Sequence, residues 1–216
     1  RIIKMLNVVE DNLVVESKGI YSIENYLTSR RLMYWQVYLH KTAVACEKVL
    51  INALNRAKFL RMTGHDIFAS PSLDYFLCNN IDASHFHTSP EALEHYSLLD
   101  DNDIWCALKV WQKSNDKILA LLSSDVINRH IFKVEVSDSP FPSDYVCQIK
   151  EQLASHFNIS PDDTKHLYSI DTVQKDMYDI NDDHISILYK DGTLRDIAEA
   201  SDILNISLLS RKVKKH

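Results

Sequence analysis

Residues 23–60 form the stretch that most constrains the fold, because its 38 residues, "IENYLTSRRLMYWQVYLHKTAVACEKVLINALNRAKFL", include neither Pro nor Gly. Both residue types destabilise helix interiors, so a stretch without them favours continuous helix. Its portion 26–41, "YLTSRRLMYWQVYLHK", is apolar nearly all round a helical projection. A helix of that kind is normally buried. We therefore predict one long helix that can bend, capped by Ser22 and buried at residues 26–41.

Three regions follow one another in the expected organisation. Residues 1–20 read as a β-hairpin-like lead-in, with two apolar runs around Glu10-Asp11-Asn12. Residues 21–128 are helical, with Ser89-Pro90-Glu91 and Asp100 or Asp101 as helix starts. Residues 129–216 form a small α+β lobe. The predicted fold class is a mainly α-helical bundle followed by this lobe.

The C-terminal lobe is expected to mix strands with one helix. Residues 143–157, "SDYVCQIKEQLASHF", are amphipathic, and Ser143 or Asp144 can cap them. The Asp191-Gly192 pair is a turn signal. Strands are predicted in "HIFKVEVSD" (130–138), "HLYSIDTVQ" (166–174), "HISILYK" (184–190) and "ISLLSRKVKK" (206–215).

Composition excludes several classes of protein. The net charge of -6 offers no general attraction for nucleic acid. No apolar run is long enough to cross a membrane. Only three Gly occur, too few for a Gly-rich phosphate loop. The four Cys lack metal or disulfide spacing, which favours reduced thiols in the cytoplasm. The first residues resemble no signal peptide and include no initiator Met, so we expect a piece of a longer protein.

A stripe of polar side chains on the long helix needs an explanation. Arg30, Tyr34 and Tyr38 follow one another at intervals of four, so each step turns only about 40° around the helix. Lys41 returns to that face, whereas His40 lies about a quarter-turn away. An Arg buried among apolar residues requires an anion. That anion is either a carboxylate of the chain, with the tyrosines as core residues, or the phosphate of a ligand.

Four segments resemble HD-domain dNTP triphosphohydrolases, which include the mammalian SAM-and-HD-domain dNTPase and bacterial phosphohydrolases about twice as long as this chain. The stripe has that family's order of Arg, aromatic or His, Tyr and then His-Lys. The other matches are "LLDDNDIWCALKVWQKSNDKILALL", "INRHIFK" and "DDHISILYKDGTLRDIAEASDI", so the likeness covers most of the chain in order. It implies the C-terminal part of an HD-domain fold.

Site roles follow from this resemblance. It implies that Arg30, Tyr34 and Tyr38 contact the phosphates or sugar of a dNTP-like substrate, with Tyr34 where mammalian members have a His. It places His40-Lys41 against a regulatory nucleotide at a subunit interface, which implies a homo-oligomer. Lys18 is a candidate further member of that regulatory site.

The family's divalent metal ion is held by a His, a His-Asp pair and an Asp that precede the stripe. We expect these ligands outside this chain, and so no catalytic or metal-binding residue within it. Gly64-His65-Asp66 follows the stripe and lacks partner ligands, so it is not interpreted as the HD motif. His85 and His87 are two residues apart, so in a strand both would lie on one face and could bind one metal ion. The preferred interpretation is that they lie in a surface loop. The basic end (Arg211, Lys212, Lys214, Lys215) is interpreted as a solvated strand end or tail.

The sequence thus predicts the C-terminal half of a metal-dependent HD-superfamily nucleotide phosphohydrolase, inactive when isolated. The alternative is a non-catalytic nucleotide-sensing or oligomerisation module that uses the same stripe. A purely structural helical domain is the third possibility.

Overall fold

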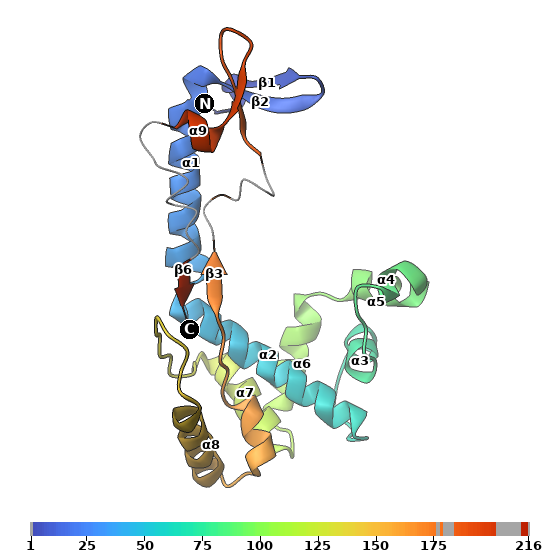
Figure 1. Ribbon diagram of the computed structural model, residues 1–216. Helices are drawn as coiled ribbons and strands as arrows, with labels where there is room; N and C mark the ends of the chain where they lie inside the picture. The colour runs from blue at the N-terminus through green and yellow to red at the C-terminus, as the bar shows by residue number, and fades with distance from the viewer. Residues whose placement is uncertain (1, 176–177, 179–183, 202–212, 216) are drawn as a thin grey trace. The chain divides into compact units, whose positions relative to one another are not determined.

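The structure is a computed structural model that describes residues 2–175, 178, 184–201 and 213–215 (Figure 1). The chain divides into two compact units. Unit 1 comprises residues 1–40, 136–140 and 171–216, and unit 2 comprises residues 41–135 and 141–170. The units interleave along the chain, so they do not follow the sequential order of lead-in, helical region and lobe. The expected fold class, mainly helical with a small α+β part, is confirmed.

The sheet of unit 1 joins the two ends of the chain. Strands β1 (Leu6–Val9) and β2 (Asn12–Glu16) form the expected antiparallel hairpin, turned by positive φ angles of 49° at Glu10 and 62° at Asp11. The strand order is β1-β2-β4-β5. Strand β4 (Ser186–Leu188) pairs in parallel with β2 and antiparallel with β5 (Leu194–Asp196). The hairpin is therefore part of a larger sheet and no separate lead-in.

Helix α1 (Ile20–Met33) begins earlier than expected. It follows the 3-10 helices η1 (Ile2–Met5) and η2 (Ser17–Gly19), and its N-cap is Gly19, so the predicted Ser22 cap is wrong. A Cβ on Gly19 would lie 2.7 Å from Val15 Cγ1, so only glycine lets the helix start this close to the sheet. Strand β2, helix α1, strand β4 and the short helix α9 (Ile197–Ala200) share one core: Val15, Ile23, Leu27, Tyr178, Ile187 and Ile197.

The long helix is interrupted, so the prediction of one continuous helix is wrong. A π-helical turn, η3 (Tyr34–Tyr38), follows α1, and Leu39 N donates to Tyr34 O at 2.7 Å, an i to i+5 bond. Leu39 then leaves helical geometry, with φ -99° and ψ 12°. Helix α2 (Lys41–Met62) starts afresh beyond His40. Because neither Pro nor Gly is present here, no local signal marked the break.

Unit 2 is built around α2. Helices α3 (Pro71–Cys78), α6 (Asp101–Trp111) and α7 (Lys117–Asn128) share its core, which includes Val49, Ala53, Leu73, Leu108, Trp111, Leu119 and Leu122. Helices α4 (His85–Thr88) and α5 (Pro90–Leu98) follow α3. Two predicted starts are confirmed. Ser89 Oγ accepts from Ala92 N at 3.2 Å, and Asp100 forms a capping box with Asp103.

The last part of unit 2 is held to α2 by polar contacts. Helix α8 (Ser143–Phe157) leads into η4 (Pro161–His166), a 3-10 helix. Arg56 of α2 pairs with Asp163 of η4, and with Asp116 at 2.6 Å. Helix α8 has Pro142 as its N-cap and no side-chain cap, so the expectation of Ser143 or Asp144 is wrong.

The strand predictions were partly right. Residues 130–138 form no strand, and no strand of the described chain is paired with them. Of residues 166–174, only the end is extended, in β3 (Val173–Lys175), which pairs antiparallel with β6 (Val213–Lys215). The predictions for residues 202–212 lie outside the described residues. None of the helices among the described residues is long and apolar enough to cross a membrane.

Candidate functional site on helix α1

One cavity of about 460 Å³ lies along α1 and the π-helical turn of unit 1. Three of its lining residues are the predicted Arg30, Tyr34 and Tyr38. The spacing of four residues therefore brings these side chains to one site, as helical geometry requires. The complete lining is Tyr26, Ser29, Arg30, Met33, Tyr34 and Tyr38.

Aromatic contacts connect the three predicted residues into a row. The Arg30 guanidinium carbon lies 5.4 Å from the centre of the Tyr34 ring, a cation–π distance. The centres of the Tyr34 and Tyr38 rings are 5.4 Å apart, with the planes tilted by 54°. Both tyrosines belong to the π-helical turn, so the irregular backbone itself sets the spacing of this pair.

The cavity is suited to an anion with an apolar or sugar-like body. Arg30 is the one charged residue among the described lining residues, and no carboxylate is among them. Ser29 and the three tyrosines add neutral hydroxyl donors. Met33 and the aromatic rings supply apolar surface. A guanidinium fork with nearby hydroxyls is suited to phosphate oxygens.

The stripe is accessible to solvent in this chain, so the expectation of a buried helix is wrong. Leu32, Met33, Val37 and Tyr38 expose 48% to 56% of their surface. Arg30 and Tyr34 are half-buried. The argument that a buried Arg30 must have an anion therefore does not hold for this chain, and its accessibility instead leaves it open to a ligand.

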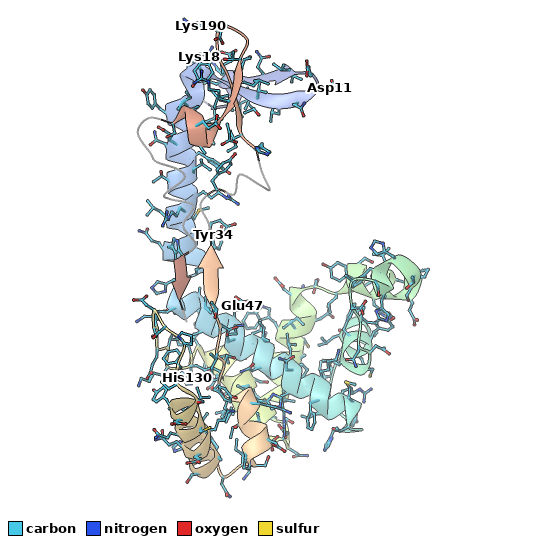
Figure 2. All side chains as sticks on the ribbon, in the orientation of Figure 1. Asp11, Lys18, Tyr34, Glu47, His130 and Lys190 are labelled. Carbon is cyan, nitrogen blue, oxygen red and sulfur yellow. The ribbon has the colours of Figure 1, made fainter. Side chains whose placement is uncertain are left out.

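The residues predicted for a regulatory site are spread along the chain. Lys18 lies in η2 at the sheet end of α1 and forms an ion pair with Glu16, whereas Tyr34 marks the other end of that helix (Figure 2). His40 follows the π-helical turn, and Lys41 is the first residue of α2. Because α1 separates Lys18 from His40, a site with both requires two copies of the chain. The regulatory role stays a prediction.

The other candidate ligands lie at the surface of unit 2. His65 and Asp66 follow α2, where Thr63 Oγ1 is 3.1 Å from His65 Nδ1 and Asp66 is 3.7 Å from Arg61. His85 and His87 lie on the short helix α4 and not in a loop. Asp82 is 2.8 Å from His85 Nδ1, and its hydrogen bonds with Ser84 and His85 lower its pKa to about 2. Along the described chain, no group of three His, Cys, Asp or Glu could hold a metal ion.

Sequence reasoning missed three lining residues: Tyr26, Ser29 and Met33. The signal for Tyr26 was present, because Tyr26 precedes Arg30 by the same four residues that separate Arg30 from Tyr34. Ser29 and Met33 flank this row at helical spacing. In the sequence, nothing distinguishes Ser29 and Met33 from other residues on a helix surface. Only the structure shows that they line the cavity.

Comparisons with known proteins show what the chain is similar to. Residues 1–69, which include the whole stripe, match a family model described as an HD associated region. A phosphohydrolase from Bacteroides thetaiotaomicron has a crystal structure that is 56% identical, with a TM-score of 0.92 over 100% of this chain. The chain is therefore similar to a phosphohydrolase, and its first 69 residues are similar to the HD associated region.

Two further proteins are similar to this chain at lower sequence identity. The uncharacterized protein YwfO of Bacillus subtilis is 28% identical over 215 residues, which is 94% of this chain. A hypothetical protein from Aquifex aeolicus shares only the fold, with a TM-score of 0.56 and 21% identity. The chain spans about half the length of the proteins it matches: 53% of the Bacteroides protein, 46% of YwfO and 46% of the Aquifex protein.

Proposed function

We propose that this chain is the substrate-binding part of a metal-dependent, cytoplasmic HD-superfamily nucleotide phosphohydrolase of the dNTP triphosphohydrolase type. The observation that carries the proposal is the cavity on α1, whose lining includes Arg30, Tyr34 and Tyr38. The HD associated region over residues 1–69 and the likeness to a phosphohydrolase support the same reading.

The three side chains have separate tasks in this proposal. Arg30 binds phosphate oxygens and balances the negative charge that develops there during hydrolysis. The Tyr34 ring keeps the guanidinium in place, as its contact at 5.4 Å suggests. Tyr38 lies against the sugar, where a close ring leaves no room for a 2'-hydroxyl.

The divalent metal ion of such an enzyme does not fit the described residues of this chain. No group of His, Cys, Asp or Glu among them could hold it. We therefore assign the metal ligands to another part of the protein and no hydrolytic step to this chain. Its contribution is binding and orientation, and in a homo-oligomer His40, Lys41 and Lys18 would meet a second nucleotide at a subunit interface.

Arg30→Ala and Arg31→Ala in the full-length protein test the proposal. The two arginines are adjacent, but only Arg30 lines the cavity, because Arg31 is turned about 100° away. A charge-assisted hydrogen bond contributes about 1.5–3 kcal/mol, so Arg30→Ala should lower kcat/KM for dGTP about tenfold to a hundredfold. Arg31→Ala should change the melting temperature more than the kinetics.

Steady-state kinetics with thermal melts as the folding control decide the outcome. Equal kinetic losses for the two variants, or a larger loss for Arg31→Ala, would place the wrong face of the helix in the site. Binding of dGTP that depends on Arg30, with no turnover in the full-length protein, would instead favour the non-catalytic nucleotide-sensing module.

A further inference from the structure

Tyr26 extends the row of cavity side chains in the N-terminal direction. It lines the cavity together with Arg30 and exposes 52% of its surface. Tyr21 offers a natural comparison, since it lies on the same helix, exposes 53% of its surface and does not line the cavity. Tyr26 therefore lines the cavity because of its angular position around the helix, and not merely because its side chain is exposed.

The position of Tyr26 along the helix axis assigns it to one end of a bound ligand. With an α-helical rise of about 1.5 Å per residue, Tyr26 lies about 6 Å along the axis from Arg30 in one direction, and Tyr38 lies beyond Arg30 in the other direction, in the π-helical turn. If Tyr38 faces the sugar and Arg30 faces phosphate, the ligand continues past Arg30 towards Tyr26. The part of a nucleotide that lies beyond its first phosphate is the rest of its phosphate chain.

The local chemistry agrees with a phosphate at this end. Ser29, a neighbour of Tyr26 in the lining, carries a second neutral hydroxyl, and no carboxylate among the described lining residues repels an anion. A phenol donates one hydrogen bond to a phosphate oxygen without adding charge. Its ring is stiff, so little side-chain entropy is lost when it binds.

We infer that Tyr26 is a further substrate-binding residue, whose hydroxyl donates to the distal phosphate and makes the cavity selective for nucleoside triphosphates over monophosphates. This inference rests on the proposed function of the same cavity. It assigns the selectivity for phosphate-chain length to one atom, Tyr26 Oη.

The test is the affinity of the full-length protein for dGTP and dGMP, measured by calorimetry with a chelator present so that no metal-dependent turnover occurs. Tyr26→Phe removes the hydroxyl and keeps the ring. It should weaken dGTP binding about tenfold and leave dGMP binding unchanged, because the lost hydrogen bond is to a charged acceptor present only in dGTP. Tyr21→Phe is the matched control and should change neither affinity.

Arg30→Ala, measured in parallel, separates this inference from the proposed function. Weaker dGTP binding by Arg30→Ala together with unchanged binding by Tyr26→Phe overturns the inference and leaves the proposed function standing. An equal loss of dGTP and dGMP affinity in Tyr26→Phe overturns the distal-phosphate assignment as well. If neither nucleotide binds the wild-type protein, or Arg30→Ala has no effect, the proposed function fails and the inference fails with it.

Discussion

At the scale of single residues, the most unusual environment outside the cavity belongs to His166 in η4. Only 5% of it is exposed, and its Nε2 has no hydrogen-bond partner among the described residues. Its backbone carbonyl accepts from Asn52 Nδ2 at 3.0 Å, so the residue is anchored to α2. Burial, and the nearby cations Arg56 and Lys165, lower the pKa of His166 although Asp163 and Asp116 oppose them.

The lowered pKa predicts that acid destabilises unit 2. The folded state keeps His166 neutral below its ordinary pKa of 6.5, whereas the unfolded chain takes up a proton there. The free energy of unfolding should therefore fall, by up to about 1.4 kcal/mol per pH unit, as the pH drops from 6.5 towards the folded pKa. The measurement is urea unfolding of wild type and His166→Gln at about pH 7.5 and about pH 5.5, above and below the ordinary histidine pKa of 6.5.

His166→Gln should lose less stability between the two pH values than wild type. His156→Gln on α8 is the matched control for replacing His by Gln at an exposed position. Asp125 has a pKa raised by burial, which gives the opposite trend with pH and cancels between wild type and variant. A drop of the same size in wild type and His166→Gln would contradict the prediction.

At the scale of elements, α1 and its π-helical turn present more apolar surface than a solvated helix usually does. Tyr21, Tyr26, Leu32, Met33, Val37 and Tyr38 are all about half exposed. Their side chains are arranged on one continuous element of unit 1 and need cover on the faces that the sheet core leaves open. A second copy of the chain or the rest of a longer protein would supply it.

We predict that the isolated 216-residue chain self-associates through this element. Leu32→Glu places a charge in the apolar surface away from the cavity lining, and should lower the mass measured by light scattering. Leu98→Glu in unit 2 is the control, since Leu98 is 63% exposed on a different element, and it should leave the mass unchanged. A stable, soluble wild-type monomer would count against the idea.

At the scale of the whole molecule, the chain has the cavity that we propose binds a nucleotide, and no group among its described residues could hold a metal ion. We predict that the isolated chain binds dGTP but does not hydrolyse it, because the cavity alone supplies no activated water. The measurement is release of inorganic triphosphate with added Mn²⁺, and the full-length protein is the positive control. Robust metal-dependent release by the isolated chain would redirect attention to His65, His85 and His87.

Local signals in the sequence determined some of the element boundaries and the row of Arg30, Tyr34 and Tyr38. The caps at Ser89 and Asp100 depend on hydrogen bonds within a few residues, as does the turn at Asp191-Gly192, where Gly192 N donates to Tyr189 O at 3.0 Å, so the sequence alone predicts them. Arg30, Tyr34 and Tyr38 line one cavity because they follow one another at intervals of four residues through α1 and the π-helical turn, and that spacing is visible in the sequence.

Tertiary structure alone decided the features that depend on distant partners. The parallel pairing of Val15 with Ile187 joins segments from opposite ends of the chain, and residues 130–138 form no strand and are paired with no described strand. The break after Tyr38 carries no Pro or Gly, and the exposure of α1 depends on what packs against it. The alternation and the apolar content of a segment indicate which of its faces can be buried. Whether another element is present to cover that face depends on the rest of the chain.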